Sequence, residues 1–598
     1  MNYIDKKENA KIQLDDILRY VKYYPHFKEG EVTAEFENGT GLSDDFQLDI
    51  VYGTAYSIKK YYMESGNPRQ MRGASQNLNK IFNEHIPLYL EKKYKKECIY
   101  YQGGSQILII MPSGCGSEIA SYIEDCFEKY APTANNVAVT ISCSANDLLC
   151  NSKYIEVRKK ISDLCMERRM LKFDSNLIDI RNGFVLDVSK HKYLNQYSGQ
   201  EMRCERCRLR IPKYIANIEN DSFLLCPSCA RKEMEGDYHA RNYFRDACKS
   251  YGKEHLPDII LNVDENIRTT DDLQDENGDI ALLYADVNNL GGMGFKIQGI
   301  CDERVFFEAV DETVKDALYY SIILAMKCFD ALKYGEQNVE KEVEGRFEII
   351  AVGGDDICLI LPAQIVLSCA TMLVRKFEEV WEKNYQSGFE RELGGSVHLS
   401  ISAGISIASY NTPLTYMQDA TEQLLKSAKQ LSHAKKDKKM HGAIDILSLN
   451  SDGQWAAELD FLRNYKDERN PLFKPGVRMT LRPFAVEEAE VFLEVLELAR
   501  KLPMHLLRNI DSACKEMTRE EASLYFDYVM SKIRNNRSSQ NKYELIKKQC
   551  ALVRKMKGEK PEKPEKAPAM FIKSENEEYV TPWHDILDLY DQRGGGLR

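Results

Sequence analysis

Three aspartates are the residues of this sequence best suited to chemistry. Asp286 follows an apolar run, residues 280–285, that we expect to be a buried strand. Asp355 and Asp356 follow a Gly-Gly pair at the tip of a predicted β-hairpin. We expect the two strands to be neighbours in one sheet, so that the three carboxylates converge at its edge. Clustered carboxylates repel one another unless cations lie between them, and oxygen ligands select Mg²⁺ or Mn²⁺.

A site of this kind is suited to phosphoryl or nucleotidyl transfer with two metal ions. One ion lowers the pKa of an attacking 3′-hydroxyl, and the other neutralises a triphosphate leaving group. Gly353 and Gly354 allow the sharp turn and let phosphates approach the backbone without a Cβ atom in the way. Gly and Asp are also ordinary turn residues, but Asp286 on the preceding strand favours the metal site.

Several polar residues near the aspartates are candidates for contacts with a nucleotide. They are Asn288, Asn289, Gly291, Ser402, Lys429 and Lys435. The two asparagines and the glycine follow Asp286 in a loop that could hold phosphates or a ribose, although a simple strand-to-helix turn explains them equally well. Ser402 lies on the strand beside the hairpin, where packing is the default interpretation. The lysines could reach a triphosphate, but each alone is more typical of a protein surface.

Four cysteines have the spacing of a zinc site. Cys204 and Cys207 form one Cys-x-x-Cys pair, and Cys226 and Cys229 form a second pair after eighteen residues. Each pair can offer two thiolates to one ion, and two pairs complete a tetrahedral Zn²⁺ site. Because the two pairs occur together, a redox role is disfavoured. With no open position implied, we expect a structural ion that holds a small ribbon together.

Two segments of the chain resemble each other, and they predict the elements that position the aspartates. Residues 100–112 and 350–362 each contain a β-rich run, a Gly-Gly turn and an apolar strand that ends in proline. Each segment is preceded by a similar strand, from Asp49 or Ala281, and followed by a helical stretch and a further strand, from Val137 or Ser396. The order β–helix–β-hairpin–helix–β is that of a ferredoxin-like palm. We therefore predict two palms, produced by an internal duplication.

The first predicted palm lacks the acidic residues of the second. Ser105 and Gln106 stand where the second palm has its aspartate pair, and Thr54 stands where it has Asp286. We expect no catalytic metal in the first palm.

The predicted fold class is α+β with several domains: two palms, a four-cysteine zinc ribbon and an α-helical C-terminal domain. The helical prediction rests on the amphipathic stretch from Val486 to Leu502, and a Pro-rich charged segment precedes the tail. The expected domains are residues 1–195 (inactive palm-like domain), 196–275 (zinc ribbon and linker), 276–449 (catalytic palm), 450–557 (helical domain) and 558–598 (linker and tail).

Composition limits the classes of function. The 598 residues are 43% apolar and 29% charged, which is ordinary for globular proteins. A net charge of −11 argues against a protein that covers nucleic acid with most of its surface. The stretch from Arg534 to Lys557 has eight basic residues and one acid; a solvated helix face, RNA contact and contact with an acidic subunit all remain open. With no signal segment and no spanning helix, we expect a cytoplasmic protein without a membrane partner and with reduced thiols.

The motifs taken together resemble one known family. YADVNNLGG, GGDD, SAGISIA and the paired Cys-x-x-Cys ribbon are similar to the large polymerase/cyclase subunit of type III CRISPR effector complexes, the signature subunit of the Csm/Cmr family. The Arg-Gly-Ala-Ser sequence at residues 72–75 also resembles a helix start of that family. The similarity extends over about residues 46–450.

The resemblance implies a nucleotidyltransferase that is switched on by RNA. In that family, pairing of the guide RNA with target RNA activates the palm, which converts ATP into a messenger, usually cyclic oligoadenylate. Carried over to this sequence, Asp286, Asp355 and Asp356 bind the metal ions, and no general base is apparent. The implied partners are ATP, guide and target RNA, a small helical subunit at the C-terminal domain, and the subunit that holds the 5′ end of the guide.

Three other functions compete with this one. Some family members without a nuclease resemble ligases that join AMP from ATP to S-adenosylmethionine, so this product is the alternative. A diguanylate cyclase would normally have Glu in place of Asp356 and Phe in place of Ile357. A non-catalytic scaffold subunit would have no evident need for the three aspartates.

We expect no DNase activity. Many relatives begin with an HD nuclease domain, but the first palm is predicted to begin near residue 46. The His584-Asp585 pair stands alone in the tail, without the additional His and Asp residues that such a metal site needs.

Overall fold

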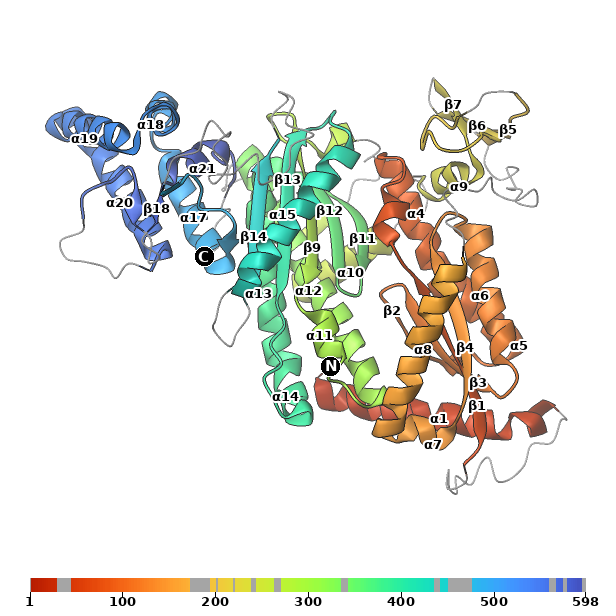
Figure 1. Cartoon of the computed structure of the whole chain (residues 1–598). Coiled ribbons are helices and arrows are strands. Elements are labelled where there is room, and N and C mark those ends of the chain that lie inside the picture. The colour runs from red at the N-terminus through yellow and green to blue at the C-terminus, as the bar shows by residue number, and fades with distance from the viewer. Residues whose placement is uncertain are drawn as a thin grey trace.

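The computed structural model describes residues 2–28, 45–172, 194–199, 203–218, 221–237, 243–262, 270–334, 342–434, 441–449, 476–558, 566–573 and 578–593. Two α/β lobes lie side by side in this part of the chain (Figure 1). The four-cysteine region lies above the first lobe, and the C-terminal helices extend from the far side of the second lobe. No helix within these ranges is long and apolar enough to cross a membrane.

The first lobe is an antiparallel sheet with the strand order β2-β3-β1-β4. Its strands are β1 (Gln47–Ala55), β2 (Ile99–Gly103), β3 (Gln106–Pro112) and β4 (Asn136–Ser144). Its main helices are α4 (Pro68–Lys80), α5 (Ile86–Lys93), α6 (Gly116–Tyr130) and α8 (Asn151–Leu171). The helix α4 begins where Pro68 fixes the backbone and the side chain of Asn67 accepts hydrogen bonds from the first free N–H groups.

The second lobe is a sheet with the order β11-β12-β9-β13-β14-β16. Its strands are β9 (Asp279–Val287), β11 (Glu348–Gly353), β12 (Asp356–Pro362), β13 (Ile401–Ser409), β14 (Ala443–Ser448) and β16 (Phe484–Ala485). The first four strands repeat the order of the first lobe, as a duplication predicts. The strand β13 begins at Ile401 and not at Ser396, because its partner β9 ends at Val287, directly opposite Ile401.

Both faces of this second sheet are buried, each by different elements. Ala281, Leu283 and Ala285 of β9 belong to the core that includes α12 (Ile300–Tyr334) and α13 (Val366–Trp381). The alternate residues Leu282 and Tyr284 belong to a core with α15 (Leu414–Ala434) and with methionines of the first lobe. Because side chains alternate along a strand, Asp286 continues this second face, where the sheet meets the other lobe.

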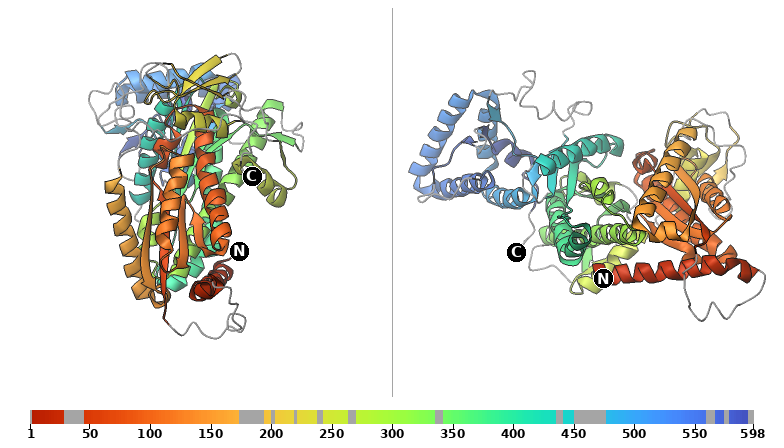
Figure 2. Two further views of the ribbon diagram at one scale, coloured as in Figure 1. Left: turned by 90° about the vertical axis from the view of Figure 1, so that its right-hand side faces the viewer. Right: turned by 60° about the horizontal axis from the view of Figure 1, so that its bottom comes forward.

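Several shorter or peripheral elements complete the two lobes. They are α1 (Tyr3–Lys28), α3 (Ile58–Tyr62), α7 (Ala145–Leu149), α10 (Tyr243–His255), β8 (Ile260–Asn262), α11 (Leu290–Gly294), β10 (Glu342–Glu344) and α14 (Ser387–Leu393). The helix α1 runs along both lobes, as Figure 2 shows, and packs against α12 of the second and β3 of the first. It therefore helps to hold the lobes together.

The C-terminal region consists of helices with a small sheet. The helices are α17 (Val486–Ala499), α18 (Met504–Glu516), α19 (Arg519–Asn535), α20 (Gln540–Met556) and α21 (Trp583–Asp588), and the small sheet contains β15 (Val477–Arg478), β17 (Ile572–Lys573) and β18 (Tyr579–Val580). The helix predicted from Val486 is α17, but the two small strand pairings were not predicted. The predicted domain boundaries stay a prediction.

The described part of the tail packs back onto this region. Trp583 and Asp585 are buried, and Asp585 accepts a hydrogen bond from the hydroxyl of Thr480 at 2.6 Å and lies 2.8 Å from Nε of Arg482. The carboxylate of Asp585, next to His584, thus makes structural contacts with Thr480 and Arg482. Part of the Pro-rich segment and the Gly-rich tip lie outside the described residues.

Candidate functional site

The strand register brings two of the three aspartates side by side. Asp356 at the start of β12 lies directly opposite Asp286 near the end of β9, and Ser402 of β13 lies opposite Asp286 on the other side. Residues in register on neighbouring antiparallel strands point to the same face, so the two carboxylates share one face. The backbone carbonyl of Asp355 accepts a hydrogen bond of 3.2 Å from the N–H of Val287, which fixes the turn to the end of β9.

The glycines of this turn meet the corresponding turn of the first lobe. Gly354 has a φ of +62° and Gly104 has a φ of +57°, a backbone region that favours glycine. A Cβ atom on either residue would lie 3.2 Å from the Cα atom of the other. The N–H of Gly354 also donates to Oδ1 of Asp311 at 3.3 Å. The two hairpin tips therefore touch, and their glycines make this approach possible.

The equivalence of the two hairpins extends to the acidic positions. Thr54 lies opposite Gln106 in the first sheet, as Asp286 lies opposite Asp356 in the second. The register thus places Thr54 and Gln106 at the positions that the repeat predicts. Their lack of a carboxylate is the chemical difference between the lobes; whether the first lobe binds a metal stays a prediction.

A cavity of about 690 Å³ lies between the lobes at these hairpins. Asp355, Asp356 and Gly353 line it from the second lobe, and residues of β1, α3, α4 and the first hairpin line it from the first lobe. The basic residues of its wall are Lys59, Lys60 and Lys315. Its volume lies within the range of about 300–1,000 Å³ that is usual for sites of small molecules.

The sequence did not single out Lys59 of α3, which the fold brings to the cavity. Its Nζ atom lies 3.9 Å from the centre of the Tyr284 ring, and its charge lowers the pKa of Asp355 and Asp356 relative to burial alone. The only feature of the sequence that could have indicated Lys59 is its position just after β1. In the repeat, this position corresponds to the segment after Asp286.

Burial and repulsion between carboxylates raise the pKa of Asp355 and Asp356. Burial, followed by the charge of Asp286, raises the pKa of Asp356 to about 7 and raises the pKa of Asp355 above its ordinary value. Within the described residues, the buried Oδ1 atom of Asp356 has no hydrogen-bond partner. Lys429 of α15 forms an ion pair with Asp286. The three carboxylates thus lie close together, and the positive charge of Lys429 balances only part of their negative charge.

A divalent cation fits this donor set. The ligands are hard oxygens, one of them is buried without a hydrogen bond, and the local charge is negative. The three carboxylates are less compact than a closed metal cage: in the described ranges, oxygens from all three do not fall within 4.8 Å of one another. Asp286 and Asp356 are the pair in strand register, and Asp355 lies next to them at the turn.

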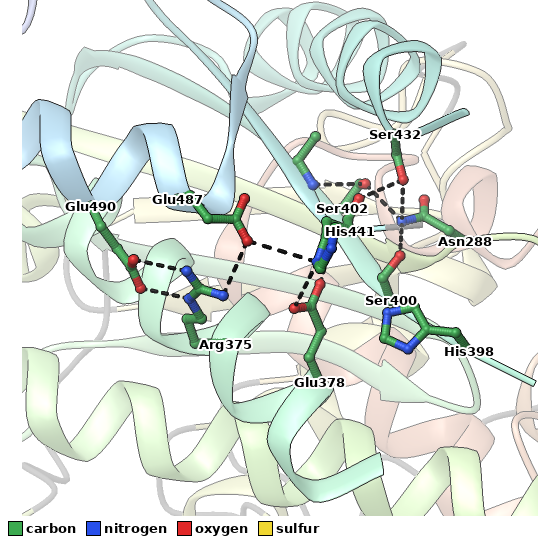
Figure 3. A network of polar contacts seen from close by, with 12 residues as sticks. Asn288, Arg375, Glu378, His398, Ser400, Ser402, Ser432, His441, Glu487 and Glu490 are labelled. Carbon is green, nitrogen blue, oxygen red and sulfur yellow. Dashed lines mark hydrogen bonds and ion pairs between the residues drawn. The ribbon is translucent and has the colours of Figure 1, made fainter. Parts of the chain in front are cut away.

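The other predicted nucleotide contacts fall into three groups. Asn288 and Ser402 are fully buried, and the Nδ2 atom of Asn288 lies 2.8–3.3 Å from the hydroxyls of Ser400, Ser402 and Ser432 (Figure 3). Asn289 has a φ of +57° at the start of α11, and a Cβ atom on Gly291 would meet open space. Lys435 lies outside the described residues. Asn288 and Ser402 therefore anchor the loop after Asp286 from inside, whereas Gly291 lies at an open position.

Replacing Asp356 by asparagine is expected to stabilise the metal-free protein. Because the folded state keeps the proton on this carboxyl up to a pH of about 7, the wild-type protein loses stability as the pH rises from about 4 to about 7. At pH 8 the Asp356→Asn variant should melt roughly 2 °C higher, and Mg²⁺ should raise the melting temperature of the wild type more than that of the variant. Differential scanning calorimetry with and without Mg²⁺ measures both effects.

The exposed Asp258→Asn variant is the control for this measurement. An equal response of both variants to Mg²⁺ would contradict binding of the ion at Asp356.

The four predicted zinc ligands lie together. Cys204, Cys207, Cys226 and Cys229 are all buried, and their sulfur atoms lie within 4.8 Å of one another. The sulfurs of Cys207 and Cys226 are 3.8 Å apart, which is too long for a disulfide bond. It matches the distance of about 3.8 Å between two sulfurs bound to one tetrahedral Zn²⁺. The cluster is consistent with the predicted zinc site, and it caps a sheet of β5 (Leu194–Gln196), β6 (Tyr214–Ile218) and β7 (Asp221–Leu225).

The helix α9 (Pro227–Glu235), which begins within this cluster, packs closely against α4. A Cβ atom on Gly73 would lie 1.8 Å from the carbonyl oxygen of Lys232, and one on Gly236 would lie 1.9 Å from that of Arg69. Glycine is therefore required at both positions. The Gly of the Arg-Gly-Ala-Ser sequence is thus a packing residue between the four-cysteine region and the first lobe.

Changing Cys204 and Cys226 to serine is expected to remove one equivalent of zinc and to unfold the four-cysteine region. Free energy of metal binding is folding energy in such small sites, so proteolysis should cut residues 203–237 in the variant but not in the wild type. Inductively coupled plasma mass spectrometry gives the zinc content. The exposed Cys150→Ser variant is the control, and an unchanged zinc content in the double variant would disprove the assignment.

Comparison with known proteins identifies the second lobe. Residues 279–439 match the family model of Cas10/Cmr2, second palm domain. This part of the chain is therefore a Cas10/Cmr2 palm domain, as the motifs predicted. A search of curated proteins found no match.

Between 64% and 78% of the chain also resembles solved structures of Csm1–Csm4 at low identity. A Csm1–Csm4 cassette in complex with cA4 is 11% identical with a TM-score of 0.38, and the match covers 68% of this chain and 54% of that chain. A cassette in complex with cA3 is 12% identical with a TM-score of 0.39, and the match covers 78% of this chain and 65% of that chain. The Csm1–Csm4 subcomplex of a type III-A interference complex is 11% identical with a TM-score of 0.36, and the match covers 64% of this chain and 53% of that chain. This chain thus spans about half the length of the first of these relatives.

Proposed function

We propose that this chain is the nucleotide-synthesising subunit of a type III CRISPR effector complex, which makes cyclic oligoadenylate from ATP when target RNA is bound. The observation that carries the proposal is the pair Asp286 and Asp356 in strand register, with Asp356 lining a cavity of about 690 Å³, in the part of the chain that matches a Cas10/Cmr2 palm domain. A scaffold subunit would not need a buried carboxylate whose pKa is raised by its neighbours.

Each residue of the site receives a role in this proposal. Asp286, Asp355 and Asp356 would hold Mg²⁺ or Mn²⁺, which would supply charge stabilisation for the triphosphate and activation of a 3′-hydroxyl. Gly353 lines the cavity, where its backbone could approach a phosphate, and Gly354 lets the turn pack against Gly104 of the first lobe. Lys59 lies at the cavity wall opposite, where its positive charge favours binding of a phosphate group.

The side chains of the first lobe complete the cavity without adding carboxylates at the equivalent positions. Gln106 offers a neutral polar group to the cavity, whereas Thr54 is buried and its hydroxyl donates to the carbonyl oxygen of Ala55. The first lobe would therefore bind and orient a nucleotide, whereas the second would hold the metal ions. Guide and target RNA, and the other subunits of the complex, would act through surfaces outside this cavity.

The test is an assay of the assembled complex. It is given ATP, Mg²⁺ and matching target RNA, with and without S-adenosylmethionine, and mass spectrometry identifies the products. Cyclic oligoadenylate that depends on target RNA supports the proposal. A product that forms only with S-adenosylmethionine would replace it by the alternative, transfer of AMP to that acceptor. No ATP-derived product under any condition would disprove an enzymatic role.

A further inference from the structure

A second group of metal-binding side chains lies on the opposite side of β13 from the acidic turn. Glu378 of α13, His398 just before β13 and His441 just before β14 each point a possible ligand atom to a common place, and these atoms lie within 4.8 Å of one another. Figure 3 shows them beside Glu487 of α17. Four separate elements thus supply this cluster.

The contacts of His441 with the two carboxylates are longer than hydrogen bonds, and its distance to Glu378 is close to that between two ligands of one ion. Nδ1 of His441 lies 3.6 Å from Glu378 and 3.7 Å from Glu487, whereas a hydrogen bond between nitrogen and oxygen measures about 2.7–3.2 Å. Two ligands of one tetrahedral ion with bonds of about 2.0–2.1 Å are about 3.3 Å apart. Within the described residues, the buried Nδ1 atom of His441 has no hydrogen-bond partner.

The charge around the cluster favours a divalent cation. Glu378, Glu487 and Glu490 contribute three negative charges, and Arg375 contributes one positive charge through contacts of 2.6–3.2 Å with the last two. With neutral imidazoles the balance is −2. Because Arg375 already pairs with Glu487 and Glu490, Glu378 is the carboxylate left for the histidines.

Neighbouring groups hold two of the ligands in place. The N–H of Gly442 donates to Oε1 of Glu378 at 2.8 Å, so that Oε2 faces His441. Oε1 of Gln386 lies 3.4 Å from Nδ1 of His398, a position from which it can orient the ring. Such outer partners are the usual companions of metal-binding histidines and carboxylates.

We propose that Glu378, His398 and His441 bind a divalent transition-metal ion, with Zn²⁺ as the best match. Two imidazoles and one carboxylate are typical ligands of Zn²⁺, whereas Mg²⁺ takes oxygen ligands. The site has three protein ligands and a fourth position beside Glu487. It is separate from the four-cysteine cluster and from the acidic turn.

The ion would lie beside Glu487 of the C-terminal region, which is 3.7 Å from Nδ1 of His441, and would support the loop after Asp286. The hydroxyl of Ser432 donates to the carbonyl oxygen of His441 at 2.7 Å and lies 3.3 Å from Nδ2 of Asn288. The N–H of Asn288 donates to the carbonyl oxygen of Ser400 at 2.8 Å, two residues after His398. Both histidines are thus connected to Asn288 by short paths, and an ion between them would fix its position.

The test is metal analysis of the full-length, untagged chain after equilibration with Zn²⁺ and gel filtration. We expect two equivalents in the wild type, one in the His398→Gln/His441→Gln variant, and one in the Cys204→Ser/Cys226→Ser variant. The His255→Gln variant changes an exposed histidine outside the cluster and should keep two. One equivalent in the wild type, or two in the double-histidine variant, would overturn the proposal and leave His441 as an ion-pair partner.

Cobalt substitution tests the same site without any variant. The first Co²⁺ in the four cysteines gives a thiolate-to-metal charge-transfer band. A second Co²⁺ at the histidines should add visible absorption without increasing that band. Saturation of the spectrum at one equivalent would contradict the proposal, even if the double-histidine variant does not fold.

Discussion

The Asp286→Asn variant is expected to form the ATP-derived product at least about 10³-fold more slowly than the wild type. Metal-held charge supplies several kcal/mol of transition-state stabilisation, and each 1.36 kcal/mol changes a rate tenfold. Asp286 lies in register with Asp356, which lines the cavity between the lobes, so its loss leaves the ions without one of their ligands. The rate is measured with the assembled complex at saturating ATP, Mg²⁺ and target RNA.

The matched control is Asp279→Asn, at the other end of the same strand. It removes a half-buried carboxylate from β9 without touching the cavity, so the rate should stay within about twofold, as for a change outside the site. Binding of target RNA should be the same for both variants. If Asp286→Asn kept more than a tenth of the wild-type rate, the catalytic assignment would be wrong. If it abolished RNA binding as well, Asp286 would be structural.

The repeat made the centre of the fold predictable from sequence. Two Gly-Gly hairpins with similar flanking strands predicted two sheets of equal strand order, and the register then placed Asp286 opposite Asp356. Period-two alternation and turn chemistry are local properties, so they can be read from the sequence. The start of β13 was predicted five residues early, because the end of a strand depends on where its partner ends.

Contacts between segments far apart in the chain could not be predicted in the same way. Lys59 reaches the cavity, and Asn288 is buried among three serines, only because segments far apart in the chain pack together. His398 and His441 carry no spacing motif that would pair them with Glu378. The role of Arg72 was likewise hidden: the sequence suggested a helix start, but the structure shows a buried ion pair.

This ion pair connects the first lobe to the strand that leads to the acidic turn. Glu348 begins β11 and is fully buried. Arg72 of α4 donates to both of its carboxylate oxygens, at 2.8 and 2.6 Å, and Arg245 of α10 donates to one at 2.7 Å. Burial alone would raise the pKa of Glu348, but the two guanidinium groups hold it below its ordinary value. A two-bond contact of this kind is among the stronger hydrogen-bonded pairs in proteins.

The Glu348→Gln variant is therefore expected to lose about 3–5 kcal/mol of stability, because two buried guanidinium groups remain without a counter-charge. The change should appear as a lower urea midpoint for the transition that separates the lobes. Glu344→Gln, which breaks a more exposed pair with Arg346, is the control and should cost at most about 1 kcal/mol. Equal midpoints for Glu348→Gln and the wild type at pH 7 would show that the pair does not hold the lobes together.

Lowering the pH should remove the difference in urea midpoint between the wild type and the Glu348→Gln variant. Because the pKa of Glu348 is lowered in the folded state, its contribution is complete above the unfolded value of about 4.3 and disappears as the pH falls through the folded value. The wild type and Glu348→Gln should therefore approach the same midpoint as the pH is lowered below about 4. A difference that persisted unchanged to pH 3 would mean that the glutamine acts through packing and not through charge. Since β11 leads directly to Gly353 and the acidic turn, the same variant should also lose product at pH 7, and adding Mg²⁺ should not restore it.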